Sequence, residues 1–325
     1  MPSTTLREDT ANTRGWTTIE TLFSDSNVRL STETVFDNGV VRLDIAANTD
    51  INETPFRTVT RTDGEANAFA WNTIETTYDA GGIRSSRVVI FDNGVERYDE
   101  FEDGVRTTST RVDNPNADDF GVMSWESIQV NFDREGNRIS RSIQYDDRTS
   151  LQTTYENGVR VQQTQFDPAI DGTGARNWEF IDSYYDGNVD LEEREIVYDN
   201  GLSRQTFYNQ GSVTAVYETD NSSDGNLYDW ETREVFYFTQ LDQNIRETNT
   251  DFDNGVQRTD IFVDGSRNYR IDRDLSPDGI AETWEQQERW YDQDGNLELQ
   301  HDDIDNGDEF VFTYDNGDRE QRSSL

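Results

Sequence analysis

The pattern in this sequence that could bind a ligand most directly is an acidic loop close to its C-terminal end. The loop reads Asp274-x-Ser276-x-Asp278-Gly279-Ile280-x-Glu282. Oxygen-bearing side chains alternate along it, as they do in calcium-binding loops, with a glycine where such loops turn sharply and Ile280 where a backbone carbonyl binds. We therefore predict a calcium site with the ligands Asp274, Ser276, Asp278, Ile280 and Glu282.

An earlier loop repeats the beginning of this pattern as Asp220-x-Ser222-x-Asp224-Gly225-Asn226. Its predicted ligands are Asp220, Ser222, Asp224 and Asn226. Two interpretations stay open for both loops, because Asp, Ser, Asn and Gly are also the residues that form good turns. The formal net charge of −39 favours a bound divalent cation. Ca²⁺ is the cofactor that the sequence predicts.

Tryptophan and tyrosine could provide a second kind of site, because exposed aromatic rings stack on sugars. Six of the seven tryptophans recur at one position of a repeat, where we interpret them as core anchors. Trp290 stands outside that position and has no tryptophan counterpart in the other repeats. Trp290 and the adjacent Tyr291 are therefore the candidate ligand-binding residues, with a surface glycan as the expected ligand.

The residue types present argue against most catalytic arrangements. His301 is the only histidine and there is no cysteine, so zinc sites and nucleophile triads have too few partners. No glycine-rich phosphate loop precedes a helix. Paired carboxylates for glycoside hydrolysis occur by chance among 67 acidic residues, and no pair stands out from the repeat. We predict that the protein is not an enzyme.

The charge balance restricts the partners. With 67 acidic and 28 basic residues, the chain should repel nucleic-acid phosphates and anionic membranes. No stretch is apolar enough to span a bilayer, so we predict neither a nucleic-acid partner nor membrane insertion. Every basic residue is Arg, which reflects either genome composition or bidentate pairing with Asp and Glu across strands. The first residues do not resemble a signal peptide, so export would need another signal or route.

Internal repetition dominates the sequence. Trp16, Trp71, Trp125, Trp178, Trp230 and Trp284 are separated by 55, 54, 53, 52 and 54 residues. They define a single repeat domain over 1–325, with a leading strand and loop at 1–15 followed by six units. These units are approximately 16–70, 71–124, 125–177, 178–229, 230–283 and 284–325. Such a period is typical of repeat architectures.

Each unit predicts four antiparallel strands joined by three hairpin turns. In the second unit the turns fall at Asp79–Gly82, Asp92–Gly94 and Glu102–Gly104, between runs rich in Thr, Val, Ile, Tyr and Arg. We expect the Asp-Asn-Gly turns to be two-residue turns with both Asn and Gly at positive φ. The fold class is therefore all-β and essentially without helices.

Six four-stranded meanders of this length favour a six-bladed β-propeller, since each unit could form one blade. The loop of about ten residues between units is long enough to connect one blade to the next. An open superhelical array of β-repeats is the alternative, and the polar centres of the strands favour it.

Several segments resemble known repeat families. YDQDGNLEL at Tyr291–Leu299, FDREGNRIS at Phe132–Ser140 and YDAGGIRSS at Tyr78–Ser86 are similar to the YD repeats of toxin shells and teneurin-like proteins. The spaced tryptophans and YDNG hairpins resemble RTX-like, type I-secreted bacterial surface proteins, although their glycine-rich nonapeptides are absent. The segment from Ser276 to Trp284 is similar to the Asp box of sialidase-like propellers, with its glycine one place early.

These resemblances imply an adhesive or structural protein without assigned catalytic residues. We expect a non-catalytic protein of the extracellular space or of a cell or particle surface, with calcium as a stabilising ion. Its partner would be a surface glycan or another surface or particle protein, and self-assembly is compatible with the repeat. A carbohydrate-binding propeller is the alternative function, and an Asp-box glycoside hydrolase is a weaker one.

Overall fold

The computed structural model describes residues 2–46, 57–64, 69–113, 123–168, 176–221, 228–238, 244–276, 282–315 and 318–324. The described residues form 25 β-strands and no helix, and none of them forms a helix that could cross a membrane. The chain divides into two compact units, Met1–Val159 and Arg160–Leu325. The division falls inside the third repeat, so it does not coincide with a repeat boundary.

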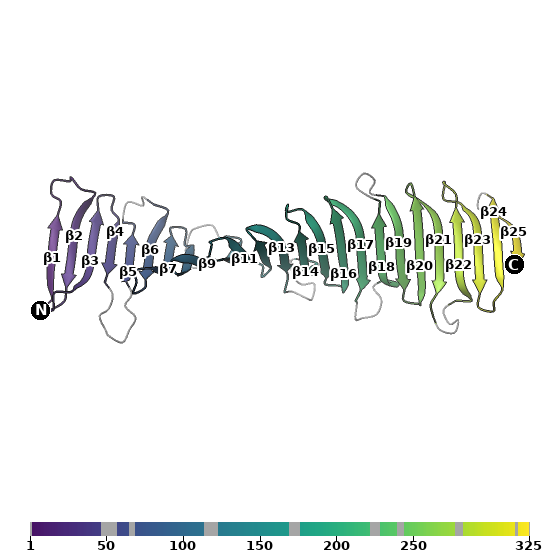
Figure 1. Ribbon diagram of the computed structural model, residues 1–325, viewed down its shortest axis with the longest axis horizontal. Helices are drawn as coiled ribbons and strands as arrows, with labels where there is room; N and C mark the ends of the chain where they lie inside the picture. Colours follow the sequence, from purple (N-terminus) through teal and green to yellow (C-terminus); the bar gives the residue numbers. More distant parts are fainter. Residues whose placement is uncertain are drawn as a thin grey trace. The chain divides into compact units, whose positions relative to one another are not determined.

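The N-terminal unit contains the first twelve strands. They are β1 (Ser3–Glu8), β2 (Trp16–Phe23), β3 (Arg29–Phe36), β4 (Val41–Ile45), β5 (Arg57–Thr62), β6 (Trp71–Tyr78), β7 (Arg84–Phe91), β8 (Glu96–Glu102), β9 (Val105–Val112), β10 (Trp125–Phe132), β11 (Arg138–Tyr145) and β12 (Ser150–Glu156). In Figure 1 these strands lie side by side in chain order.

The C-terminal unit begins with β13. Its strands are β13 (Val159–Phe166), β14 (Trp178–Tyr185), β15 (Leu191–Tyr198), β16 (Leu202–Asn209), β17 (Ser212–Asp220), β18 (Trp230–Tyr237), β19 (Ile245–Phe252), β20 (Val256–Val263), β21 (Ser266–Asp274), β22 (Trp284–Tyr291), β23 (Leu297–Ile304), β24 (Glu309–Asp315) and β25 (Asp318–Ser324). After β1, four strands fall within each of the six predicted repeats. Each recurrent tryptophan opens the first strand of its repeat.

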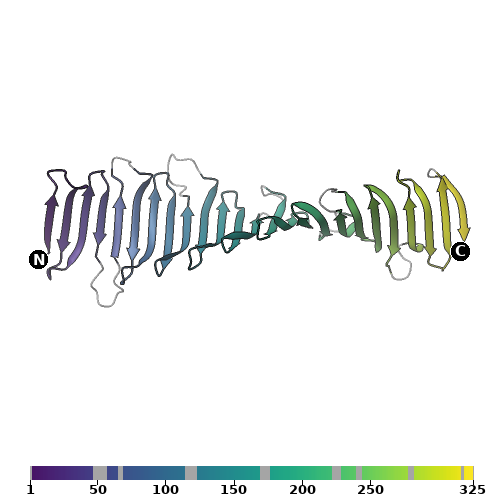
Figure 2. The same ribbon diagram turned by 45° about the horizontal axis from the view of Figure 1, so that its top comes forward.

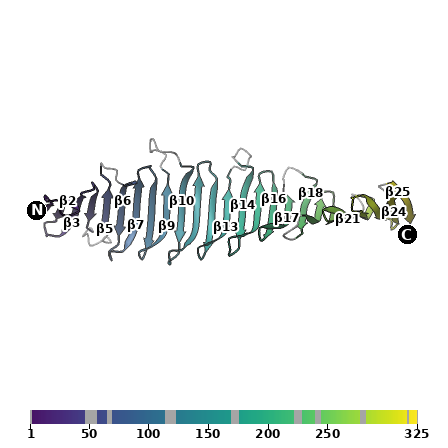
Figure 3. The same cartoon turned by 90° about the horizontal axis from the view of Figure 1, so that it is seen from above.

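Each unit is an open antiparallel sheet in a single layer. Within a unit, the described strands contact only their neighbours in sequence. The purple and blue strands of the N-terminal unit show no second layer over them (Figure 2). This sheet also twists: β1 to β4 are seen broadside in Figure 1, and β7 to β10 in Figure 3. A progressive twist is the normal result of pairing right-handed strands.

The strand pairing does not support the six-bladed propeller that the sequence favoured. Separate blades would leave the last strand of one repeat unpaired with the first strand of the next. Instead β5 pairs with β6 and β9 with β10 in the N-terminal unit. In the C-terminal unit β17 pairs with β18 and β21 with β22. The inter-repeat loops therefore join hydrogen-bonded neighbours, as in an open array of β-repeats.

The turns between strands differ from the expected type at the Asp-Asn-Gly positions. Gly94 and Gly255 have φ of 82° and 84°, whereas Asn93 and Asn254 are not at positive φ. Phe91 accepts a hydrogen bond from the Gly94 N–H and donates its own N–H to Val95 O, which defines a three-residue loop. The prediction of two-residue turns is wrong here. Neither asparagine adopts a positive φ; its Oδ1 instead accepts the N–H of the residue two places ahead.

Two-residue turns occur at the third turn of the repeat instead. Asp103 and Gly104 both have positive φ, at 51° and 83°, and Glu102 pairs directly with Val105. The first turn of the repeat is again a three-residue loop, in which Asp133 Oδ1 accepts the Asn137 N–H at 2.7 Å. The sequence thus places these described turns correctly, and one additional residue decides their type.

Most buried side chains of each sheet lie on one of its two faces, which we call the buried face; Ala215 and Ile271 are buried on the other. The cross-strand register places its centre along Val59, Thr76, Arg87, Asp99, Ser109 and Val130 in the N-terminal unit. In the C-terminal unit the same row contains Ser183, Thr206, Val216, Val235, Thr248 and Asp260. Most of these small or acidic side chains are buried. The opposite side of each sheet is the open face.

Longer side chains cover this row, which is how a single-layer sheet excludes water from one face. Arginines near the start of a fourth strand stack on an aromatic ring at the end of the next first strand. These pairs are Arg57 with Tyr78, Arg106 with Phe132, Arg160 with Tyr185 and Arg267 with Tyr291. Cation–π contacts of this kind contribute about 0.5–1 kcal/mol each at exposed sites. They join neighbouring repeats in addition to the backbone ladder.

Buried aspartates hold the arginines in place. Asp99 and Asp272 are each 2% exposed. The ion pairs are Asp44 with Arg42 and Arg57, Asp99 with Arg97 and Arg106, Asp260 with Arg267 and Arg270, and Asp272 with Arg258 and Arg289. The hydrogen bond from Arg57 lowers the pKa of Asp44. Cross-strand pairing of Arg with Asp, one of two explanations for the all-arginine composition, is therefore present.

Candidate functional site: the acidic cleft at the last inter-repeat loop

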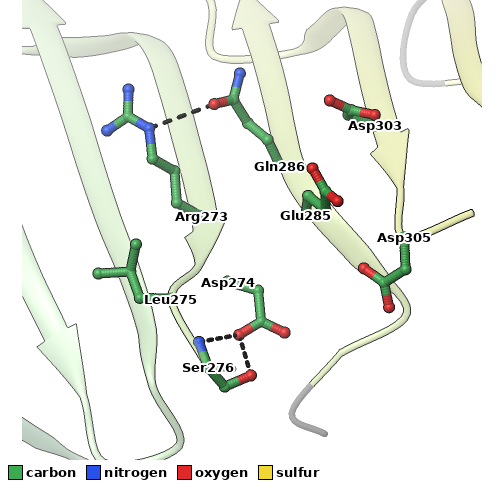
Figure 4. Close-up of a pocket in the computed structure, with 8 residues that line it drawn as sticks. All are labelled: Arg273, Asp274, Leu275, Ser276, Glu285, Gln286, Asp303 and Asp305. Carbon is green, nitrogen blue, oxygen red and sulfur yellow. Dashed lines mark hydrogen bonds between the residues drawn. The ribbon is translucent and has the colours of Figure 1, made fainter. Parts of the chain in front are cut away.

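An acidic cleft of about 570 Å³ lies where the last inter-repeat loop leaves and rejoins the sheet. It is formed by the end of β21, the start of β22 and the end of β23. The lining residues are Arg273, Asp274, Leu275, Ser276, Glu285, Gln286, Asp303 and Asp305, drawn in Figure 4. We call this cavity the acidic cleft.

Asp274 closes one side of the cleft by holding the loop. Its Oδ1 accepts hydrogen bonds from the Ser276 N–H at 2.9 Å and from the Ser276 hydroxyl at 2.5 Å. Its Oδ2 accepts the Glu282 N–H at 3.1 Å, across the loop. The Ser276 hydroxyl and then the Ser276 N–H lower the pKa of Asp274, because each donates to the ionised form.

The same clamp recurs in other inter-repeat loops. In each, and in the loop after the leading strand β1, the aspartate that ends the preceding strand or follows it accepts the N–H of the residue two places before the repeat tryptophan. The pairs are Asp9 with Arg14, Asp63 with Phe69, Asp113 with Met123, Asp220 with Tyr228 and Asp274 with Glu282, at 2.6 to 3.2 Å. The clamp fixes where the first strand of the next repeat begins. Its sequence marker is an aspartate that recurs with the period of the repeat.

The remaining acids give the cleft its charge. Glu285, Asp303 and Asp305 line it, and no ion pair joins them to an arginine among the described residues. Arg273 points its Nε at Gln286 Oε1, 3.3 Å away. Among the described lining residues, Arg273 alone offsets the negative charge of the cleft, which would therefore attract a cation.

The predicted calcium ligands are only partly described. Asp274, Ser276, Glu282 and Asp220 are described; Asp278, Ile280, Ser222, Asp224 and Asn226 lie outside the described residues. Asp274 and Ser276 do lie together in the cleft, but their contact is a hydrogen bond to each other. Among the described residues, no group of three acidic or histidine side chains is arranged to hold a metal ion. Calcium binding stays a prediction.

The predicted aromatic pair is divided between the two faces. The Trp290 ring contacts Tyr269 on the open face, with 5.3 Å between centroids. Tyr291 lies beneath Arg267, which binds the buried Asp260. Burial and then the Glu288 charge raise the pKa of Tyr269 to about 12. Trp290 therefore shares its face with Tyr269 and not with Tyr291, a cross-strand contact that the sequence does not show. Ligand binding by Trp290 and Tyr291 stays a prediction.

Comparisons with known proteins add little. No protein-family model matches the chain, and no curated protein matches it. The structure is similar to the Tc holotoxin pore of Photorhabdus luminescens, with a TM-score of 0.23, 10% identity, and coverage of 95% of this chain but 16% of that one. It is also similar to a porin-like protein from Bacteroides uniformis, with a TM-score of 0.16, 9% identity, and coverage of 88% and 93% of the two chains. These scores are too low to assign the chain to either protein's family.

Proposed function

We propose that this chain is a non-catalytic repeat protein that acts outside the cell or on a particle surface, in an adhesive or structural role. The observation that supports this most is the strand pairing that continues from one repeat to the next, as between β9 and β10. Repeats joined in this way add length and surface without needing a closed core. A surface glycan, another surface protein or a further copy would be the partner.

The site of the only histidine is consistent with this proposal. His301 Nδ1 lies 4.0 Å from Glu288, and its Nε2 lies 3.6 Å from Glu309. Both contacts are to carboxylates on neighbouring strands. Neither contact is to a hydroxyl or thiol, which His301 would need within hydrogen-bond reach to activate a nucleophile.

Labelling of intact cells tests the proposed location. An antibody against the chain should label intact cells or particles that produce it, and protease added outside should remove the label. Labelling that requires permeabilised cells would contradict an extracellular or surface role.

We further propose that Ca²⁺ binds the acidic cleft and stabilises the protein. The cleft acids Glu285 and Asp305 line the cleft together with Asp274 and Ser276, which belong to the predicted calcium-binding sequence. Millimolar CaCl₂ should raise the melting temperature more than NaCl of equal ionic strength. The double variant Glu285→Gln, Asp305→Asn should lose that difference, and Glu96→Gln, on a distant strand, should keep it. Equal effects of the two salts would reduce the proposal to charge screening.

Carbohydrate binding is a second candidate function, favoured by the Trp290–Tyr269 contact on the open face. Paired rings can stack on one sugar unit. A Trp290→Ala variant should then lose retention on an immobilised glycan that the native protein binds, whereas Tyr291→Ala, on the other face, should lose much less. The opposite ranking would assign the recognition to the buried face.

A further inference from the structure

An arginine-lined cavity of about 400 Å³ lies on the buried face of the N-terminal unit. Its arginines are Arg97, Arg106, Arg111, Arg138 and Arg141, contributed by β8, β9 and β11. Its other lining residues are Ser109, Ile128, Val130 and Phe132, so β10 supplies an apolar floor. We call it the arginine cavity. No acidic side chain lines it, although acids outnumber arginines by 67 to 28 in the chain.

Only part of this positive charge is neutralised. Asp99 pairs with Arg97 at 2.8 Å and, more loosely, with Arg106 at 3.7 Å. Arg138 lies on the Tyr155 ring and donates to its hydroxyl at 3.4 Å, which leaves its charge unpaired. Arg111 and Arg141 have no carboxylate partner among the described residues. One aspartate thus serves five arginines.

The backbone register forces some of these charges together. Arg97 and Arg111 are directly opposite each other on β8 and β9, a placement that destabilises a sheet when the charges are alike. Burial and then the charge of Arg97 lower the pKa of the neighbouring Arg87. The like-charge register therefore indicates an excess of positive charge on this face, and the lowered pKa of Arg87 agrees with it.

We propose that the arginine cavity binds an oxyanion, a sulfate or carboxylate group carried by an anionic saccharide. Guanidinium groups match the planar or tetrahedral arrangement of such oxygens and bind them through paired N–H donors. The floor of Ile128, Val130 and Phe132 offers an apolar surface to the C–H face of a sugar ring. A cavity of this volume falls in the size range of small-ligand sites, which begins at about 300 Å³.

The rest of the chain narrows the choice of ligand. A nucleic acid carries closely spaced phosphates, and those beyond the cavity would meet a protein of net charge −39. A saccharide with isolated acidic groups can place one group in the cavity and neutral hydroxyls elsewhere. This inference rests on the adhesive role proposed above and names the chemistry of its partner.

Calorimetric titration of the full chain tests the proposal. The probes are a sulfated heparin-derived disaccharide, the neutral disaccharide cellobiose and inorganic sulfate, all at one ionic strength. We expect the sulfated disaccharide to bind, cellobiose not to bind and inorganic sulfate to bind more weakly. Arg111→Asp should weaken binding by about tenfold or more, as expected for the loss of one charge-assisted contact.

Two further variants separate binding from folding. Arg111→Gln removes the charge without adding an acid and should also weaken binding, with an unchanged circular dichroism spectrum. Arg134→Gln, in the exposed turn after β10, is the matched control and should bind like the native protein. Equal binding by Arg111→Asp and the native chain would exclude the cavity as the site.

The other outcomes identify a different occupant. Equal affinity for inorganic sulfate and the disaccharide would overturn the saccharide part of the proposal. Absence of saccharide binding, combined with self-association in sedimentation that Arg111→Asp abolishes, would assign the cavity to carboxylates of a second copy. Failure of the cell-surface labelling would contradict the proposed location and leave these titrations unchanged, so the two proposals fail separately.

Discussion

The two units place arginines at the same repeat positions and differ in what faces them. Arg97 in the N-terminal unit and Arg258 in the C-terminal unit both follow an Asp-Asn-Gly turn by three residues. Arg97 is opposite Arg111, whereas Arg258 is opposite Asp272 and binds it at 2.6 Å. The residue opposite this shared arginine, Arg111 or Asp272, therefore decides whether the buried face is basic or neutralised.

This difference separates a structural use of arginine from a binding use. In the C-terminal unit the buried Asp260 and Asp272 are each held between two arginines, so these charges largely satisfy one another. In the N-terminal unit, some arginines of the arginine cavity have no carboxylate partner among the described residues. Repeat proteins often keep a shared frame and alter a few positions to create a site, since each repeat contacts only its neighbours.

The largest expected effect comes from breaking the neutral arrangement. Asp272→Asn leaves Arg258 and Arg289 side by side on the buried face. Removal of one partner of a buried ion pair costs about 3–5 kcal/mol. Because the two arginine side chains retain 31% and 22% exposure, we expect a loss of about 2–3 kcal/mol in urea unfolding.

Added sulfate should restore part of the stability that Asp272→Asn loses, because this variant has unpaired arginines like those in the N-terminal unit. Glu231→Gln, an exposed acid on β18, is the control and should change stability by less than about 0.5 kcal/mol. A variant that loses no stability would show that the Arg–Asp ladder is not structural.

A second comparison uses one turn position in the two units. Gly136 and Val189 occupy the same place in the first turn of their repeats, with φ of 86° and 71°. A Cβ at Gly136 would meet nothing within 4 Å, so only backbone strain opposes a side chain there. Gly136→Val should cost about 1–2 kcal/mol and Val189→Gly should gain up to about 1 kcal/mol, both measured by urea unfolding. Changes of the same sign would contradict the shared turn geometry.

Substitution of the aspartate that clamps the inter-repeat loop should have a smaller effect on stability in either unit. Asp274→Asn keeps an acceptor but removes the charge that strengthens three hydrogen bonds. Asp113→Asn in the N-terminal unit removes the charge that strengthens the bond from the Met123 N–H. We expect each to lower stability by about 1 kcal/mol, with or without Ca²⁺. A loss for Asp274→Asn that appears only in Ca²⁺ would instead make Asp274 a metal ligand.

The smallest effect is the pH dependence of the ion pairs. The pKa of Asp44 is lowered below its ordinary 3.8, first by the Arg57 hydrogen bond. Its contribution to stability is therefore complete above pH 3.8 and is lost as the pH falls through the lower folded-state pKa. Asp44→Asn should make unfolding less sensitive to pH below 3.8, and identical acid profiles for variant and native protein would contradict the pairing.

Features that depend on neighbouring residues could be predicted from the sequence. Trp71 and Trp125 correctly mark the first strands of their repeats, and the Asp-Gly pair at 103–104 forms the expected two-residue turn. The type of the Asp-Asn-Gly turns could not be predicted. A two-residue and a three-residue loop both place glycine at positive φ and differ only in which backbone groups pair.

Features that depend on distant residues were missed. A loop of about ten residues can lead to a new blade or to the adjacent position in the same sheet, so the propeller and the open array were equally compatible with its length. The arginine cavity was invisible for the same reason, since it needs β8, β9, β10 and β11 in register. Asp274 was selected from the sequence as a calcium ligand, and the structure adds its role as a loop clamp.

The sequence by itself determined that this protein is built of four-stranded repeats, which contain no helix in the described residues, because alternation and turn residues act within a few residues of one another and recur with the tryptophan period. Only the tertiary structure decided that the repeats pair edge to edge and that arginines gather on the buried face of the N-terminal unit. Those outcomes depend on hydrogen-bonded register between strands, and a shift of one residue would move every side chain to the opposite face.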